Sequence, residues 1–309
     1  MTLAWDVTLH VGLLVIAPLL LLGVIQKTKA WFAGRSGAPL LQPYFDVWKL
    51  LRKGAVYSRT TTWLFRAGPI VSLATALCAG LVLPLAEKSS PLGFSGDVIL
   101  FVYLFGLGRF FTMAAALDTG SSFEGMGASR EAAFSAFAEP ALLLCLAILC
   151  VPARSVSLGD ALGALPAAPL GLSHPAYLAA ALGLFGVLLA ENSRIPVDDP
   201  NTHLELTMIH EVMVLDHGGP DLALVLYGSA VKLFVVGALL VQVALPSPAQ
   251  GGWQSVGLFL GGQLGLAVGI GCVESMMARL RLPRVPQFLV GASVLAGIGL
   301  AALLYRGAP

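Results

Sequence analysis

Residues 191–221 read ENSRIPVDDPNTHLELTMIHEVMVLDHGGPD, and they separate two long apolar segments at 174–190 and 221–245. This short stretch holds seven of the chain's seventeen acidic residues and three of its five histidines. Long apolar segments on either side of a strongly charged one are typical of membrane-spanning helices joined by an aqueous loop. The contrast therefore predicts a membrane fold.

The composition extends this interpretation to the whole chain. Its 309 residues are 57% hydrophobic and only 11% charged, whereas soluble domains carry about 25% charged residues. We expect an all-α, polytopic integral membrane protein whose residues 1–309 form a single transmembrane domain. The four cysteines lie in apolar segments without a CxxC pair, which indicates small buried residues and not metal ligands or disulfides.

Eight segments are apolar over a length close to the ~20 residues with which a helix crosses a bilayer. The N-terminal segment has no basic region before it and no cleavage site, so it is expected to be a retained span and not a signal peptide. The predicted spans are 8–25, 68–86, 97–117, 138–153, 174–190, 221–245, 253–272 and 286–305.

The distribution of lysine and arginine predicts the orientation, because positively charged loops stay in the cytoplasm. Of the eighteen basic residues, thirteen lie in the loops on one side, three on the other side and two within spans. Both termini are therefore expected outside, and the cytoplasmic loops are predicted to be 26–66, 118–137, 191–220 and 273–285.

The first of these loops contains an amphipathic pattern. Apolar residues recur at helical spacing at Leu41, Tyr44, Trp48 and Leu51, with charged residues between them. This pattern predicts a short helix lying on the membrane surface. The alternative is a basic juxtamembrane anchor without further function.

A helix is also predicted within the acidic loop. Asp198 and Asp199 precede Pro200, which suits a helix N-terminus, and Gly218-Gly219-Pro220 suits its end. We therefore expect a helix over residues 200–216. Its apolar stripe would consist of Leu204, Met208, Val212 and Leu215.

His203, His210 and His217 follow one another at intervals of seven residues. On a helix they would share a face but lie ~10 Å apart, which is too far for one metal ion to bind two of them. The HExxH pattern of zinc proteases is absent, because Val214 stands where the second histidine would be. These histidines are expected to hydrogen-bond to the carboxylates or to contact another subunit.

Several charged residues lie at or inside the apolar segments. Glu139 opens the fourth span, where a carboxyl group is costly unless it is protonated, paired or hydrated. Glu191 and Arg194 follow the fifth span, and they form either a local ion pair that caps a helix end or part of a buried polar chain. In the seventh span, glycines at 257, 261, 265 and 269 predict a close helix–helix contact.

The sequence contains no P-loop, no dinucleotide-binding glycine motif, no nucleophile elbow and no basic-aromatic surface for nucleic acid. Nothing in it indicates a self-contained active site.

Three loop segments nevertheless resemble a known family. They are GAPLLQPYFDVWKLLRKG at 37–54, GMGASREAAFSAFAEP at 125–140, and ENSRIPVDDP followed by HLELTMIHE at 191–211. In this order they resemble the loop motifs of the membrane-anchor subunit shared by respiratory complex I, as its subunit 1 or H, and the membrane-bound nickel–iron hydrogenases. The resemblance spans essentially the whole chain.

Departures from the complex I pattern favour the hydrogenase branch. Complex I subunits usually carry an acidic, ERK-like sequence before the first motif and Arg-Tyr-Asp-Gln after the seventh span, where this chain has QKTKAWFAGRSGAP and ARLRLPRVPQF. The run THLELTMIHEVMVLDHGGPDLAL is similar to anchors of the formate hydrogenlyase subunit 4 type. Asp216, His217 and Gly218 replace the more usual Glu-Tyr-Ser, which leaves the role of position 216 open.

The resemblance implies a non-catalytic subunit of an oxidoreductase complex in a bacterial cytoplasmic (inner) membrane. Its loops would dock hydrogenase-like large and small subunits and iron–sulfur subunits, and its spans would contact antiporter-like membrane subunits. The nickel–iron centre and the iron–sulfur clusters would lie in those partners, with no cofactor or metal bound by this chain.

The resemblance also implies roles for individual residues. A charged proton route would run through Glu139, Glu191, Arg194, Asp198, Asp199, Glu205, Glu211 and Asp216. Docking of the peripheral arm would use Gln42, Asp46, Lys49, Arg130, His203 and His210. Two alternatives remain: an H-type subunit of an NADH:quinone oxidoreductase that forms part of a quinone chamber, and a purely structural anchor without proton transfer.

Overall fold

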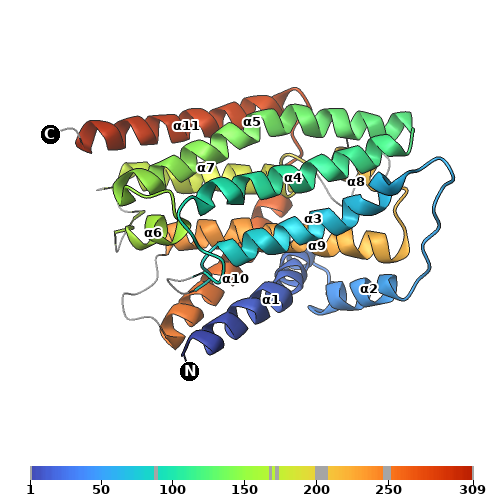
Figure 1. Ribbon diagram of the computed structural model, residues 1–309, viewed down its shortest axis with the longest axis horizontal. Helices are drawn as coiled ribbons and strands as arrows, with labels where there is room; N and C mark the ends of the chain where they lie inside the picture. Colours follow the sequence, from blue (N-terminus) through green and yellow to red (C-terminus); the bar gives the residue numbers. More distant parts are fainter. Residues whose placement is uncertain are drawn as a thin grey trace.

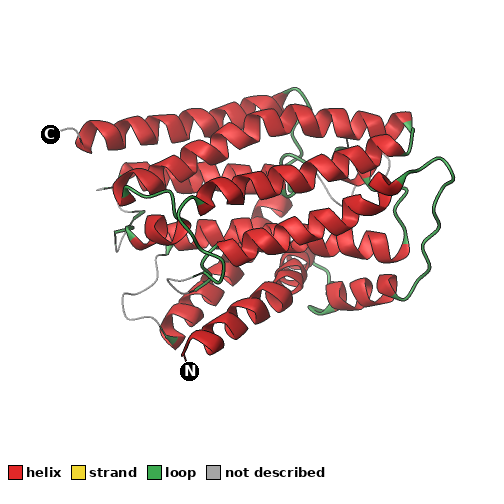
Figure 2. Cartoon of the chain, viewed as in Figure 1, coloured by secondary structure: helices red, strands yellow, loops and turns green. Residues whose placement is uncertain are grey.

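The computed structural model describes residues 2–86, 90–166, 169–170, 174–198, 208–245 and 252–307, with side chains from Trp5 to Tyr305 within those ranges. This part of the chain is helical and contains no strand (Figure 2). Its helices are α1 (Thr2–Phe32), α2 (Gln42–Leu51), α3 (Trp63–Val82), α4 (Asp97–Asp118), α5 (Ser122–Ala153), α6 (Leu158–Gly163), α7 (Pro175–Glu191), α8 (His210–Met213), α9 (Gly219–Ala244), α10 (Trp253–Met276) and α11 (Arg284–Gly307).

The long helices lie side by side as a bundle (Figure 1). Helix α3 packs against α4 and α9, α5 packs against α7 and α11, and α1 packs against α9 and α10. Seven helices in the described ranges are long and apolar enough to cross a membrane, and α7 is an apolar helix of 17 residues. Each of the eight predicted spans coincides with one of these helices. The chain is therefore a multi-pass, all-helical membrane protein, as the sequence predicts.

The helices extend beyond the apolar segments that predict them. Helix α1 continues to Phe32, and α5 begins at Ser122, so that most of the predicted loop 118–137 is helical. The sequence REAAFSAFAE within that segment is rich in alanine and glutamate, which are strong helix formers. Polar residues of the second loop motif are thereby fixed on a rigid helix.

The amphipathic helix in the first loop is confirmed as α2. It packs on α9 and α1, and the Tyr44 hydroxyl donates a hydrogen bond to the carbonyl of Ile16. Phe45 and Trp48 remain 60% and 63% exposed. Exposed aromatic residues with basic neighbours such as Lys49 are typical of a helix in the membrane interface.

The predicted helix over 200–216 is wrong in its described part. Residues 199–207 lie outside the described ranges, α8 covers only four residues, and Val214–Asp216 form turns. Asp198 binds the start of α8. Its Oδ2 accepts hydrogen bonds from the backbone N–H groups of Ile209 and His210, at 3.2 Å each, and so caps α8.

The glycine stripe of α10 does not form a contact within the described chain. A Cβ built on Gly257, Gly261, Gly265 or Gly269 would meet no atom within 4 Å. Helix α10 instead packs through Gly262, beside Val241 of α9, and through Gly271, beside Thr28 of α1. The prediction overlooked these two positions because both lie outside the four-residue repeat.

The close approach of α1 and α10 gives a first prediction. A Cβ on Gly271 would lie 2.7 Å from Thr28 Cβ. Gly271→Leu should therefore force the two helices apart and destabilise the protein by about 1–3 kcal/mol, as overpacking does. The measurement is the thermal unfolding midpoint of the purified protein in detergent.

Gly257→Leu is the matched control, because it adds the same side chain to the same helix at an open position. It should leave the midpoint unchanged or raise it slightly, since leucine is the better helix former. Equal effects of the two substitutions would contradict the packing described above.

Candidate functional site

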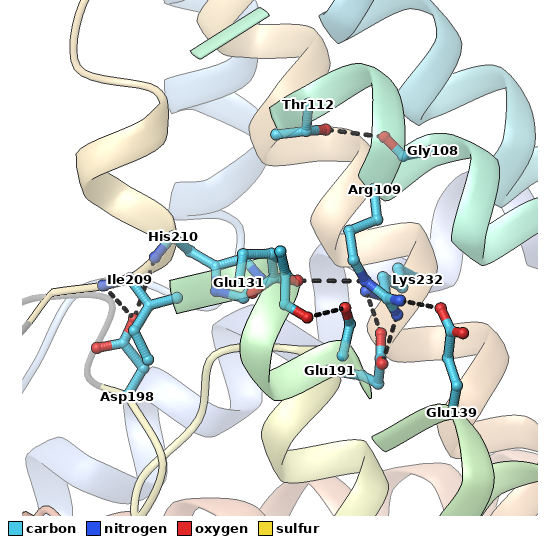
Figure 3. A network of polar contacts seen from close by, with 12 residues as sticks. Gly108, Arg109, Thr112, Glu131, Glu139, Glu191, Asp198, Ile209, His210 and Lys232 are labelled. Carbon is cyan, nitrogen blue, oxygen red and sulfur yellow. Dashed lines mark hydrogen bonds and ion pairs between the residues drawn. The ribbon is translucent and has the colours of Figure 1, made fainter. Parts of the chain in front are cut away.

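A buried arginine on α4 joins helices from across the bundle (Figure 3). The side chain of Arg109 is 5% exposed. Its guanidinium group forms an ion pair with Glu139, donates to Glu191 Oε1 at 2.5 Å, and lies with Nε 3.3 Å from Glu131 Oε1. The three carboxylates come from α5 and α7, so one guanidinium group connects three spans.

The network continues from Glu191 into α9. Lys232 Nζ lies 2.7 Å from Glu191 Oε2, and the Glu191 side chain is 6% exposed. Glu191 is therefore held between two cations, one on each carboxylate oxygen. Both cations lie in apolar helices, where an ionisable side chain is rare without a partner or a function.

The network also reaches the loop surface. His210 Nε2 lies 3.5 Å from Glu131 Oε2, and the His210 backbone N–H donates to Asp198. Asp198 Oδ1 in turn accepts a hydrogen bond of 2.7 Å from Arg279, in the segment between α10 and α11. The contacts thus form one continuous chain from that loop to Lys232. We call Arg109, Glu131, Glu139, Glu191, Lys232 and His210 the charge hub.

Carboxylates outnumber permanent cations in the charge hub. Arg109 and Lys232 stand against Glu131, Glu139 and Glu191. A proton on one carboxyl group or on His210 would balance this excess of one negative charge. Because the groups share partners, a proton gained at one of them changes the free energy of ionising the others. The ionisation of each group in the charge hub is therefore coupled to that of the others.

A separate cluster lies at the loop end of α10. Glu274, whose side chain is fully buried, pairs with Lys29 at 2.9 Å and with Arg194 at 3.2 Å. These contacts tie the ends of α1 and α10 to the segment after α7. Arg194 therefore belongs to this cluster and not to the charge hub, and it forms no local pair with Glu191. We call Lys29, Arg194 and Glu274 the loop clamp.

The remaining predicted proton-route residues are dispersed. Asp216 is exposed, and its backbone N–H donates to the buried Glu124 at 3.2 Å. Glu211 lies on α8 and is half-buried. Asp199 and Glu205 fall outside the described residues. Of the predicted route, the structure brings Glu139, Glu191 and Asp198 into one network.

The predicted docking residues also separate into groups. Gln42 and Asp46 are hydrogen-bonded to each other on α2 at 2.8 Å, and Lys49 is exposed on the same helix. Arg130 donates to the carbonyl of Met208 at 3.0 Å and so holds the α8 segment against α5. His210 joins the charge hub, and His203 lies outside the described residues.

The sequence prediction missed the centre of the network. Arg109, Lys232 and Glu131 were not among the predicted route residues, although Arg109 and Lys232 are the only basic residues inside the predicted spans. An ionisable residue inside a span is itself a signal of function. No group of three or more potential metal ligands lies close together in the described part of the chain.

His217 is a buried histidine in the segment between α8 and α9. Its ring stacks on Phe65 with a centroid distance of 4.0 Å. Burial lowers its pKa below the ordinary value of 6.5, and the nearby carboxylates of Asp221 and Asp216 offset this in part. Neutral histidine is therefore the form that the fold favours.

Removal of the central cation should be strongly destabilising. Arg109→Gln leaves the buried Glu131 without its guanidinium partner and Glu191 with Lys232 alone, which should cost about 3–5 kcal/mol. Adding Glu131→Gln removes the carboxylate that has lost its cation and should restore part of the stability. The exposed Arg59→Gln is the control with the same change in charge. Thermal unfolding of the four proteins in detergent tests this, and equal midpoints for the Arg109 and Arg59 variants would refute it.

His217 should contribute to instability in acid. Below its ordinary pKa of 6.5 the unfolded chain takes up a proton that the folded chain binds less readily, so the free energy of unfolding falls as the pH falls. His217→Phe keeps the ring stack and removes the titrating group. The midpoint should therefore fall less for this variant than for the wild type between about pH 7.5 and about pH 5.5. A parallel decline of both proteins would contradict this assignment.

Comparisons with known proteins agree with this architecture. The model of the family described as NADH dehydrogenase matches residues 6–306. Formate hydrogenlyase subunit 4 of Escherichia coli is 32% identical over 95% of this chain and 94% of its own length. The H-type chain of NADH-quinone oxidoreductase from Syntrophotalea carbinolica is 30% identical over 87% of this chain and 82% of its own length.

A further relative and a solved structure extend the comparison. Hydrogenase-4 component C of Escherichia coli is 33% identical over 76% of this chain and 72% of its own length. A chain in the structure of a membrane-bound sulfane sulfur reductase, described as an archaeal respiratory membrane complex, covers 98% of this chain with a TM-score of 0.83 at 21% identity. That chain shares the fold. The family model and the relatives together establish that this membrane protein belongs to the NADH dehydrogenase family.

Proposed function

We propose that this chain is the membrane-anchor and coupling subunit of a multisubunit, membrane-bound hydrogenase of the formate hydrogenlyase type. Its similarity over nearly full length to formate hydrogenlyase subunit 4 supports this branch. The loops at the ends of the spans dock the peripheral arm on the cytoplasmic side of a bacterial inner membrane. The nickel–iron centre and the iron–sulfur clusters are held by that arm, and antiporter-like subunits adjoin the spans.

The observation that carries the coupling role is the continuous polar chain from Arg279 to Lys232. Its outer end, at Asp198 and Arg279, lies where a docked subunit can alter its electrostatic environment. A redox-linked change in charge at the docked arm shifts the proton occupancy of the charge hub. The hub passes that shift to Lys232, deep in α9, from which neighbouring membrane subunits receive it.

A second candidate is a quinone-chamber subunit of an NADH-quinone oxidoreductase. The H-type relative from that enzyme, at 30% identity, supports it. The two candidates differ in the composition of the complex. Purification through a tag on this chain, followed by assays of nickel content and hydrogen evolution, tests the hydrogenase assignment. A nickel-free complex with quinone-dependent NADH oxidation would replace it with the second candidate.

The coupling role is tested in sealed membrane vesicles that contain the intact complex. Glu191→Gln and Glu139→Gln each remove a carboxylate from the charge hub and should reduce proton translocation per electron transferred by about tenfold or more. Electron transfer measured with an uncoupler should persist. Proton translocation is followed with a pH-sensitive dye.

Asp160→Asn is the matched control, because this exposed carboxylate bonds only to Ser155 among the contacts described and lies outside the hub. It should translocate protons like the wild type. Normal translocation by both hub variants in assembled complexes would show that the chain is a purely structural anchor.

A further inference from the structure

A groove outside the charge hub opens between the C-terminal parts of α1 and α10, two helices that are neighbours in the bundle (Figure 1). Its volume is about 520 Å³. Val24 and Trp31 of α1 and Val268 and Cys272 of α10 form part of its apolar wall. The groove therefore combines an apolar floor with a position at the loop end of two spans.

Two cations lie at the rim of this groove, Lys27 and Arg35. Neither forms an ion pair with a carboxylate in the part of the chain that the structure describes. Lys27 Nζ donates to the backbone carbonyl of Ser36 at 2.5 Å, which holds the ammonium group over the groove. Lys29, by contrast, is neutralised by Glu274. The rim thus has an excess of positive charge.

The aromatic residues fix the depth of the rim in the bilayer. Trp31 is 76% exposed and packs edge-on against Phe32, which is 44% exposed. Exposed tryptophan at the end of a span is typical of the headgroup level of a membrane. The cations beside it therefore lie at the level of the lipid phosphates.

A shallow apolar strip leads from the groove into the span. Gly261, Leu264, Gly265 and Val268 share one face of α10, because they follow one another at helical spacing. The two glycines have open space where a Cβ would be, and Leu264 and Val268 are exposed. The strip is an apolar surface that starts at the groove and runs along α10. An acyl chain can lie along such a surface.

We propose that this groove is a binding site for an anionic phospholipid. The phosphate lies between Lys27 and Arg35, and one acyl chain follows the strip on α10. This occupant places a negative charge between the two cations and covers the apolar wall. A helix of another subunit in the same place would cover the wall but leave two cations without counter-charge at its edge. The charge therefore favours a lipid.

The test places the photoreactive amino acid p-benzoyl-phenylalanine at position 268 of the chain, within the intact complex. The complex is reconstituted into nanodiscs of phosphatidylcholine with a minority of phosphatidylglycerol. After irradiation, the adduct is identified by mass. Phosphatidylglycerol should be enriched roughly tenfold over its share of the bilayer, as two basic groups at the membrane surface imply. The same amino acid at Val294, an exposed position of α11, should capture the lipids in their bulk ratio.

Variants that remove charge then distinguish lipid binding at this groove from a general attraction of the basic loop to anionic lipid. Lys27→Gln with Arg35→Gln should return the lipid captured at position 268 to the bulk ratio. Lys53→Gln with Arg59→Gln removes the same amount of positive charge from two other exposed positions of the loop 26–66. This pair should leave the enrichment of phosphatidylglycerol at position 268 intact. A protein adduct at position 268, the bulk lipid ratio in the unsubstituted chain, or equal loss in both charge variants would each overturn the proposal.

Discussion

The guanidinium group of Arg109 constrains the arrangement of three spans. It has five N–H donors in a rigid plane, and three carboxylates from two other helices surround it. A rotation or shift of α4, α5 or α7 would leave at least one charge buried without its partner, which costs several kcal/mol. The packing of these helices is therefore fixed by electrostatics as well as by apolar contact.

The glycines next to the network make this arrangement sterically possible. Gly108 precedes Arg109, and a Cβ there would lie 2.5 Å from Thr75 Oγ1 of α3. Gly127 of the second loop motif lies against the segment that starts α8, where a Cβ would be 2.9 Å from the Ile209 carbonyl oxygen. That close approach brings His210 within reach of Glu131. A glycine at position 127 of the motif thus has a steric reason, because it allows the loop end of the network to form.

The sequence predicts the helices well and the network only in part. Each span is predictable because its apolar length alone is decisive, and α2 is predictable because its amphipathic spacing is local. The partners of Arg109 are not predictable in this way, since Glu139 and Glu191 lie 30 and 82 residues further along the chain. Which face of each helix meets the others depends on packing across the whole bundle. The helix predicted over 200–216 failed in its described part for a related reason, because the carboxylate of Asp198 binds the backbone N–H of Ile209, eleven residues further along the chain.

The ratio of charges distinguishes the two ionic clusters. In the loop clamp, one fully buried carboxylate faces two cations, Lys29 and Arg194. In the charge hub, three carboxylates face two cations, and the Glu139 side chain is 44% exposed. An excess of carboxylates with one accessible member is the condition under which a proton can enter and be shared. The clamp therefore holds the loops in place, whereas the surplus carboxylate of the hub is the feature on which the proposed coupling role depends.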